Sequence, residues 1–272
     1  MPSSMRPISE WPAEARRQIT GVFTDSDHTL TTSGAITPDA LQALADLKAA
    51  GLHVIAITGR PVGWSEPFAQ SWPVDAIVAE NGAVALIPVR PELVEGSVHK
   101  PYQQDAATRA VNFARMQEIA RRILRDVPGT QLAQDSPGRE TDIAIDHSEF
   151  THLAADKIAQ VVQLMQSEGM NASVSSIHIN GWFGAHNKWE GARWIVRELL
   201  GRELDAEINQ WVYVGDSTND QIMFEHFPHS VGVANIRRFE AELTHSPRYV
   251  TLSERGAGFV ELATALLGTR AG

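Results

Sequence analysis

The chain has 272 residues, enough for one large domain or two smaller ones that bury a core without disulfides. Its 43% hydrophobic and 21% charged residues are ordinary for a globular protein and exclude a disordered or collagen-like chain. The 23 basic and 33 acidic residues give a formal net charge of −10, and basic residues gather only in pairs. We therefore expect no nucleic-acid partner, whereas an anionic small molecule stays compatible because a local site need not follow the net charge.

The sequence contains neither cysteine nor a long apolar stretch. The lack of cysteine excludes disulfides, thiolate zinc sites and a cysteine nucleophile. No segment approaches the ~20 apolar residues of a membrane span, and residues 1–18 lack the apolar core of a signal peptide. We expect a cytoplasmic protein without a membrane partner, and we interpret residues 1–18 as a polar extension with a helical turn or two around 11–18.

Apolar runs alternate with helical patterns in the first third of the chain. Residues 19–24 form an apolar run that ends at Asp25, which is typical of a buried strand. Thr37 and Pro38 then begin a helix whose leucines recur at helical spacing before Gly51. Further along come a strand at 53–59, a helix at 62–70, a strand at 76–79 and a turn with a strand over 80–87. This alternation predicts an α/β fold with a parallel sheet.

The pattern changes between residues 88 and 184. It there predicts a helix at 105–126, a strand at 141–146, a helix at 151–167 and a strand at 172–180. The α/β pattern then resumes with a helix at 187–200, strands at 211–216, 230–234 and near 249, and a last helix near 258–267. The stretches at the two ends of this segment, 87–96 and 180–187, are rich in Pro, Gly and Asn, as linkers often are. We therefore predict an inserted second domain at 88–184 within a core made of 19–87 and 185–272.

Two carboxylates follow the first strand in the segment DSDHT, residues 25–29. Asp25 and Asp27 lie at a strand-to-loop transition, at the sheet edge where α/β proteins bind ligands. One can act as a nucleophile or metal ligand and the other as a general acid/base. The alternative is that one of them only caps a turn, a common use of aspartate.

Three further polar segments end strands or begin helices. Thr58 and Gly59 offer a hydroxyl and backbone N–H groups to an anion, unless Thr58 is an ordinary helix cap. Lys188 stands in the first turn of a helix, where it could equally be a surface lysine. Asp216 ends a strand and, with Asp25, can supply the oxygen ligands that Mg²⁺ prefers. A second carboxylate in the segment GDSTND lies four residues further on. Its role could be limited to a favourable interaction with the dipole of the following helix.

The order of these segments, DxDxT, then Thr, then Lys, then GDxxND, resembles the haloacid dehalogenase superfamily of phosphohydrolases. The resemblance covers nearly the whole chain after about residue 19. It implies a Rossmann-like core with a parallel sheet and an inserted α+β cap domain of the C2 type. Asp25 and Thr58 are 33 residue steps apart, but 130 steps separate Thr58 from Lys188, so the cap follows the third strand. That position resembles the type IIB, Cof-like subfamily, as do ENGA at 80–83, SVGVAN at 230–235 and GAGFVE at 256–261.

The resemblance implies a role for each of these residues. Asp25 would attack phosphorus and form an aspartyl-phosphate, and Asp27 would act as the general acid/base. The ligands of Mg²⁺ would be the Asp25 side chain, the Asp27 backbone carbonyl and Asp216. The phosphoryl oxygens would be bound by Thr58, Gly59 and Lys188. Metal-bound water or the lysine would be ordered by Asn219 and Asp220.

Four residues are candidates for substrate contact. Asn81 follows another strand end. In VSSIHINGWF, residues 174–183, strand alternation gives a core face with Ser175, Ile177 and Ile179. The opposite face, which could overhang the cleft, carries Ser176, His178 and Asn180. Trp182 could form an aromatic platform for a sugar; the alternative is a solvent-exposed sheet face with Trp182 packed at a hinge.

The resemblance implies a Mg²⁺-dependent phosphohydrolase that acts on a small phosphorylated metabolite, in particular a sugar phosphate. Sucrose-phosphate phosphatases and phosphomannomutases are relatives of this subfamily. The alternatives are a phosphosugar mutase and a non-catalytic phosphometabolite-binding protein. Family members usually have Gly where this chain has His28, which could touch substrate or fill the loop. Arg60 could equally bind near the phosphate or brace its loop by a salt bridge. The sequence leaves the oligomeric state open.

Overall fold

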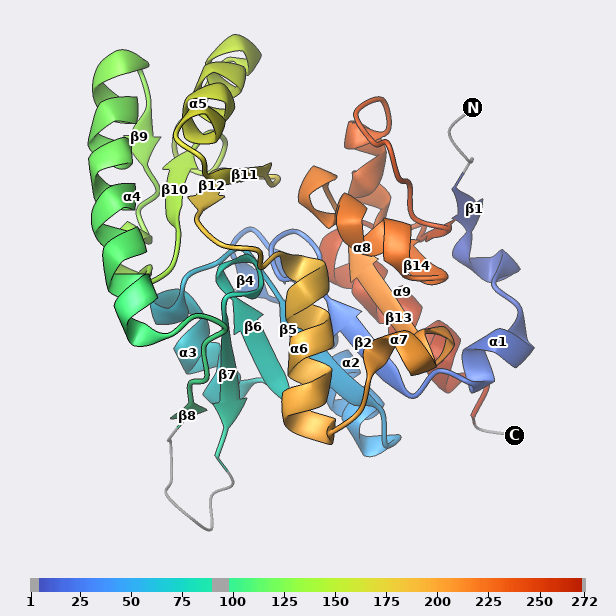
Figure 1. The fold of residues 1–272 in the computed structure, drawn as a ribbon. Coiled ribbons are helices and arrows are strands. Elements are labelled where there is room, and N and C mark those ends of the chain that lie inside the picture. The colour runs from blue at the N-terminus through green and yellow to red at the C-terminus, as the bar shows by residue number, and fades with distance from the viewer. Residues whose placement is uncertain (1–4, 90–97, 271–272) are drawn as a thin grey trace.

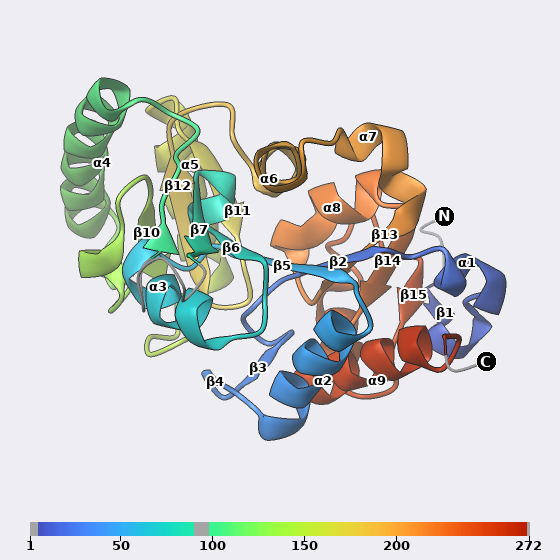
Figure 2. The same cartoon turned by 90° about the horizontal axis from the view of Figure 1, so that it is seen from below.

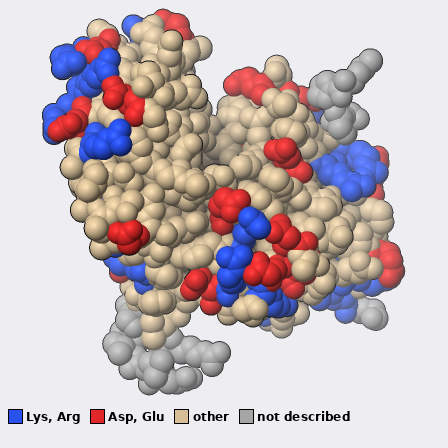
Figure 3. Space-filling view, in the orientation of Figure 1, with Lys and Arg blue, Asp and Glu red and all other residues tan. Residues whose placement is uncertain are grey.

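The computed structural model describes residues 5–89 and 98–270. They form a large unit around a nine-stranded sheet and a smaller unit around a four-stranded sheet (Figure 1; Figure 2). In these two ranges no helix has the length and apolar character needed to cross a lipid bilayer. On the face shown in Figure 3, Lys and Arg lie interspersed with Asp and Glu, and the surface is hollowed between the two units.

The large sheet is parallel over most of its width. In order across the sheet, its strands are β1 (Arg6–Pro7), β15 (Tyr249–Val250), β14 (His229–Gly232), β13 (Trp211–Gly215), β2 (Gly21–Thr24), β5 (His53–Ile57), β6 (Ala76–Ala79), β7 (Val84–Pro88) and β8 (Val98–His99). β7 pairs antiparallel with β6, and β8 pairs antiparallel with β7, which differs from the parallel sheet expected. β7 is antiparallel because the short 3₁₀ turn η2 (Glu80–Gly82) returns the chain beside β6 without a crossover helix.

Helices cover both faces of this sheet. One face is covered by α2 (Pro38–Ala49), α3 (Val62–Ser71) and α9 (Arg255–Leu267). The other is covered by α6 (Lys188–Leu200), α7 (Leu204–Glu207) and α8 (Gln221–His226). Alternate residues of β5 show the division, because Val54 and Ala56 join the first hydrophobic cluster whereas Ile55 and Ile57 join the second. The predicted α/β core is therefore confirmed.

The N-terminal segment is more ordered than the polar extension expected. It contains β1, η1 (Ile8–Glu10) and α1 (Ala13–Arg17), the last of which agrees with the expected helical turn. Trp11 is buried and stacks on Tyr249 with a centroid distance of 5.5 Å. β1 was missed because two residues carry no detectable strand period.

The smaller unit, which we call the cap, comprises residues 106–182. Its sheet has the order β11 (Asn171–Val174), β12 (His178–Trp182), β10 (Ile143–Asp146) and β9 (Gln131–Leu132), and its helices are α4 (Ala106–Asp126) and α5 (Ala155–Ser167). The prediction of one continuous strand at 172–180 is wrong. The segment is a hairpin of β11 and β12, and its turn lies at 175–177. The predicted boundary at residue 88 falls before β8, which pairs within the large sheet.

The remaining short elements lie in the connections. They are the hairpin β3 (Thr31–Thr32) and β4 (Ala35–Ile36) and the 3₁₀ turns η3 (Ser136–Gly138), η4 (Ile208–Gln210), η5 (Thr218–Asp220) and η6 (Ala234–Phe239).

A glycine contact fixes α6 against the turn that follows β6. Gly82 has a φ of +106°, and a Cβ placed on it would lie 2.3 Å from the carbonyl oxygen of Asn187. A Cβ on Gly191 would in turn lie 2.6 Å from the Cα of Gly82. The two backbones therefore touch, and this contact sets the position of the first turn of α6.

We expect Gly82→Ala to destabilise the protein more than Gly51→Ala does. Both glycines have positive φ, but nothing lies within 4 Å of a Cβ on Gly51. Both variants carry backbone strain of about 1–2 kcal/mol. The overlap at position 82 adds ~1–3 kcal/mol. Denaturant titration measures both unfolding free energies, and equal losses would contradict the proposed close approach.

Candidate active site

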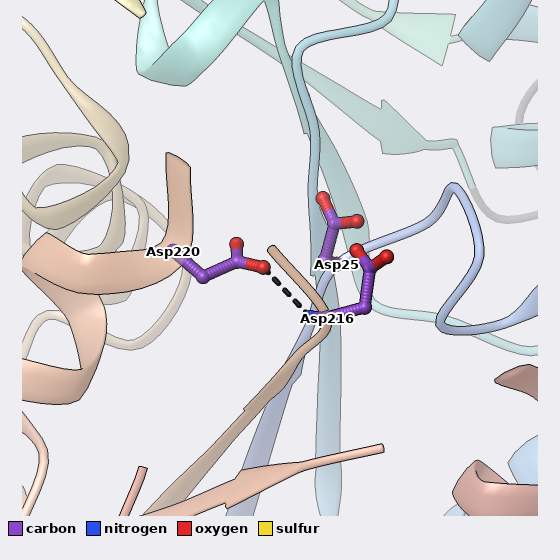
Figure 4. A group of neighbouring side chains, drawn as sticks. All are labelled: Asp25, Asp216 and Asp220. Atoms are coloured by element: carbon purple, nitrogen blue, oxygen red, sulfur yellow. Dashed lines mark hydrogen bonds between the residues drawn. The ribbon is translucent and has the colours of Figure 1, made fainter. Parts of the chain in front are cut away.

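The predicted polar segments converge at the carboxyl edge of the large sheet. Asp25 follows β2 and Asp216 follows β13, and the two strands are neighbours. The backbone N–H of Asp25 donates to the carbonyl oxygen of Val214 at 2.9 Å, which continues the ladder to the site. Figure 4 shows Asp25, Asp216 and Asp220 pointing into one space. This is the edge where open α/β sheets bind ligands.

Lys188 is the cation of this cluster. Its Nζ donates to Asp25 Oδ1 at 2.6 Å and to Asp220 Oδ1 at 2.8 Å, and its side chain is 2% exposed. Burial alone would lower the pKa of Lys188, but the two carboxylates hold it above its usual value. The ammonium therefore stays charged, and it is not the surface lysine of the alternative interpretation.

Asp220 has an internal structural role. Its Oδ1 also accepts from the hydroxyl of Tyr213, and its Oδ2 accepts from the backbone N–H groups of Asp216 and Ser217 at 2.8 and 3.1 Å. A Cβ on Gly215 would lie 2.4 Å from Asp220 Oδ2, so the strand end needs glycine there. Both oxygens of Asp220 thus already have donors, and the residue positions Lys188 and the loop after β13.

The acidic cluster fits a divalent cation. Carboxylate oxygens of Asp25, Asp216 and Asp220 lie within 4.8 Å of one another. Asp216 Oδ2 accepts from Asn235 Nδ2 at 2.9 Å, whereas its buried Oδ1 has no hydrogen-bond partner among the described residues. Burial raises the pKa of Asp25 to about 7, because Lys188 offsets only part of the desolvation, and burial beside other carboxylates raises that of Asp216. A hard cation with oxygen ligands would remove this cost.

The loop after β5 is built from buried polar groups. Thr58 is 1% exposed, and its Oγ1 accepts from the backbone N–H of Arg60 at 3.1 Å. The carbonyl oxygen of Thr58 accepts from the N–H of Asn81, whose φ is 55°. Asn81 Nδ2 is buried without a partner among the described residues. The strained turn η2 therefore presents a free amide beside Thr58 and Gly59.

Asp27 pairs with Arg60, whereas Asp25 pairs with Lys188. Its Oδ2 accepts from Arg60 Nε at 2.8 Å and its Oδ1 from Arg60 Nη2 at 2.9 Å, a two-pronged ion pair. Arg60 thus makes the salt bridge that was one of its two expected roles. The Asp27 side chain lines an opening of about 320 Å³ together with His28, Arg60 and Glu149.

Comparison with known proteins gives two kinds of similarity. Residues 22–129 match the haloacid dehalogenase-like hydrolase family. No curated protein shows a significant match. Among solved structures, a Thermoplasma acidophilum protein has a TM-score of 0.67 at 15% identity over 92% of this chain and 98% of that chain.

Two further solved structures are named as phosphatases. The sucrose-phosphatase from Synechocystis, solved with sucrose and phosphate, has a TM-score of 0.63 at 16% identity over 92% of this chain and 98% of that chain. A sugar phosphatase of haloacid dehalogenase subclass IIB has a TM-score of 0.60 at 14% identity over the same shares. The match to the haloacid dehalogenase-like hydrolase family over residues 22–129 agrees with the predicted resemblance. The predicted fold, a Rossmann-like core with an inserted cap, is confirmed.

The sequence analysis did not predict two features of the site, the backbone conformation of His28 and the role of Asn235. His28 has a φ of 56°, the left-handed region that glycine adopts freely, which explains why glycine is usual there. Its carbonyl oxygen accepts from Asn235 Nδ2 at 3.1 Å, and Nδ2 also binds Asp216. Asn235 thereby joins the loops after β2 and β13. Its place directly after the strand predicted at 230–234, at the same sheet edge, was the available signal.

The cap residues expected to meet substrate are occupied by protein contacts. His178 Nε2 lies 2.8 Å from Glu149 Oε2, and Asn180 Nδ2 donates to Asp142 Oδ2 at 2.8 Å. Trp182 lies in the cap core, and its Nε1 donates to the carbonyl oxygen of His186. Asn180 Nδ2 also lies 3.3 Å from the carbonyl oxygen of Gly59 in the core, on the strand face opposite the buried Ile179. The contact of these cap residues with substrate stays a prediction.

A cleft of about 390 Å³ lies between the cap and the core. Its described lining consists of Asn81, Gln166, Met170, Asn171, Ala172, Ser173, Trp182, Asn187, Lys188, Thr218, Asn219, Gln221 and Ile222. Asn219 lines this cleft, and its Oδ1 accepts from Ser217 Oγ at 2.8 Å. Thr218 Oγ1 donates to the carbonyl oxygen of Val174 in the cap. The cleft thus joins four of the predicted residues, Asn81, Trp182, Lys188 and Asn219.

We expect Mg²⁺ to stabilise the folded protein through this cluster. A cation that binds only the folded state adds ~2.7 kcal/mol at 100 times its dissociation constant. Asp216→Asn removes one ligand and one buried like charge, so it should lose the Mg²⁺ response and be at least as stable as wild type in chelator. Thermal unfolding with EDTA or MgCl₂ measures both effects. The exposed Asp205→Asn is the control, and an undiminished Mg²⁺ response of Asp216→Asn would contradict the site.

Proposed function

We propose that this protein is a Mg²⁺-dependent phosphohydrolase that acts on a small sugar phosphate through an aspartyl-phosphate intermediate. The observation that carries the proposal is the buried pair of Asp25 and Lys188 beside the unpartnered oxygen of Asp216. Family and fold support a phosphatase, because the matched family is one of hydrolases and two similar structures are named as phosphatases.

Asp25 is the proposed nucleophile. Its Oδ1 is held by Lys188, so Oδ2 is the oxygen left to attack phosphorus. A bond forms between Oδ2 and phosphorus while the bond from phosphorus to the leaving oxygen breaks, and Asp27 gives that oxygen a proton. Asp27 then takes a proton from water, whose oxygen attacks phosphorus and frees Asp25 with inorganic phosphate as product.

The other residues stabilise the charge on the transferred group. In this proposal Lys188, Thr58 and the N–H of Gly59 would bind the phosphoryl oxygens next to Asp25. A Mg²⁺ ion bound by Asp25, Asp216 and the carbonyl oxygen of Asp27 would offset the repulsion between carboxylate and phosphate. The proposed phosphate site therefore contacts only the group that all phosphate monoesters share.

The cleft supports an uncharged polar group as the remainder of the substrate. Lys188 is the one charged side chain in the described lining of this cleft, and it is engaged at the phosphate site. Amides supply much of the rest, from Asn81, Gln166, Asn171, Asn187, Asn219 and Gln221. Amide groups both donate and accept hydrogen bonds, as a sugar hydroxyl requires, whereas a second anionic group would find no cation there.

We expect Asp25→Asn to reduce phosphate release by more than 100-fold while the protein stays folded. The amide cannot serve as the attacking oxygen, and its size matches that of the carboxyl. Released phosphate from p-nitrophenyl phosphate measures activity, and circular dichroism checks the fold. Asp205→Asn, an exposed residue outside the site, should keep full activity. Residual activity of Asp25→Asn above a hundredth of wild type would rule out the covalent mechanism.

A phosphate-release panel tests the substrate class. We expect monophosphates of neutral sugars to be hydrolysed with at least 10-fold higher kcat/KM than bisphosphates or phosphorylated sugar acids of similar size. The reason is the lack of a second cation in the cleft lining. A preference for the doubly anionic compounds would contradict this. Conversion of a sugar phosphate to its positional isomer without release of phosphate would instead identify a mutase.

A further inference from the structure

One guanidinium group, that of Arg60, binds three carboxylates from the core and the cap. Arg60, in the core, binds Asp27 of the core and two residues of the cap, Asp135 and Glu149. Its Nη1 donates to Asp135 Oδ2 at 3.0 Å and its Nη2 to Glu149 Oε1 at 2.7 Å. The Arg60 side chain is 6% exposed, so these ion pairs are largely shielded from water. All three guanidinium nitrogens are used, and both units fix the plane of the group.

The cap holds its two carboxylates in place. Asp146, at the end of β10, accepts hydrogen bonds from the backbone N–H groups of residues 148–151, which include that of Glu149. Burial would raise the pKa of Glu149, but His178 and Arg60 lower it to about 2. Arg139 pairs with Asp135 at 3.0 Å. The cap therefore presents two ionised carboxylates at defined positions.

Other contacts also hold the cap against the core and do not involve Arg60. Glu80 accepts from the backbone N–H groups of Glu140 and Thr141 in the cap. The hairpin turn of the cap contacts the core through Ser176 Oγ, 3.1 Å from His28 Nδ1. We therefore expect the cap to stay folded after the loss of one cap carboxylate, so that the effect on Arg60 can be measured.

We propose that Glu149 and Asp135 form a latch on Arg60 that orients Asp27 when the cap is closed. Glu149 is then a positioning residue for proton transfer, acting through Arg60. The inference rests on the proposed function in assigning Asp27 as the acid/base. When the cap lifts, Arg60 loses two of its three partners, and the guanidinium that fixes the Asp27 carboxylate is free to rotate. Proton donation to the leaving oxygen is therefore coupled to cap closure, because a misplaced catalytic group costs rate steeply.

The first test compares two aryl esters of similar shape. Phenyl phosphate needs a proton on its leaving oxygen more than p-nitrophenyl phosphate does, because nitrophenolate is the more stable anion. We expect Glu149→Gln to lower kcat/KM, which reports the steps up to departure of the leaving group, by about 10- to 100-fold on phenyl phosphate and by less than about 3-fold on p-nitrophenyl phosphate. Arg60→Lys, which keeps the charge but not the planar fork, should show the same split.

The matched control is Glu168→Gln, the same substitution at a cap residue that pairs with Arg122 on the surface. Both esters should be hydrolysed by this variant as by wild type. Equal losses of kcat/KM on the two esters for Glu149→Gln would show a general structural effect and overturn the proposal. An unchanged kcat/KM on both esters would overturn it as well.

The second test measures the latch without using activity. The chain has no cysteine, so Val111→Cys in the cap and Leu252→Cys in the core, both at exposed positions, give two unique sites for spin labels. We expect one main distance in the otherwise unchanged protein and an added longer population in Glu149→Gln and Arg60→Lys, but not in Glu168→Gln. Unchanged distances would overturn the latch. If wild type releases no phosphate from either ester but the distances shift, the proposed function fails while the cap contact stands.

Discussion

The burial of three carboxylates around one ammonium is the constraint on which the rest of the site depends. Like charges in a low-dielectric interior repel strongly, and one lysine cannot balance three aspartates. The fold meets this constraint in stages. Backbone N–H groups and Tyr213 satisfy Asp220, Lys188 is shared between Asp25 and Asp220, and Asn235 binds one oxygen of Asp216. What remains is a small set of buried oxygen atoms whose natural partner is a divalent cation.

The contact between the cap and the core also buries charged side chains, which need partners of opposite charge. Arg139 is buried between Asp135 and Asp142, and it also donates to the carbonyl oxygen of Gly59 in the loop after β5. Burial raises the pKa of Asp142 to about 7 although Arg139 opposes the shift. The docked cap keeps these charges out of water, which is tolerable only when each has a partner. The interface therefore favours one docked arrangement, and it includes the loop of Thr58 and Gly59 that we propose to bind phosphate.

The sequence predicted the site best where its candidate residues directly follow predicted strands. Asp25, Thr58 and Asp216 each follow an apolar run, and the topology of a parallel sheet places such positions together. The hairpin of the cap was missed because the sequence pattern predicted one strand over 172–180. The turn at 175–177 contains serines, which occur in both strands and turns. The triple pairing of Arg60 was also hidden, since its partners lie 33, 75 and 89 residues away and no local pattern encodes them.

The two ends of the large sheet have a consequence for solubility. An exposed sheet edge is a template for pairing with another chain, and long flat edges promote aggregation. Here β1 and β8 close the two ends, and each is only two residues long. β1 ends in Pro7, which has no N–H to offer a further strand. The N-terminal segment thus does more than extend the chain: with Trp11 stacked on Tyr249, it seals β15 against intermolecular pairing.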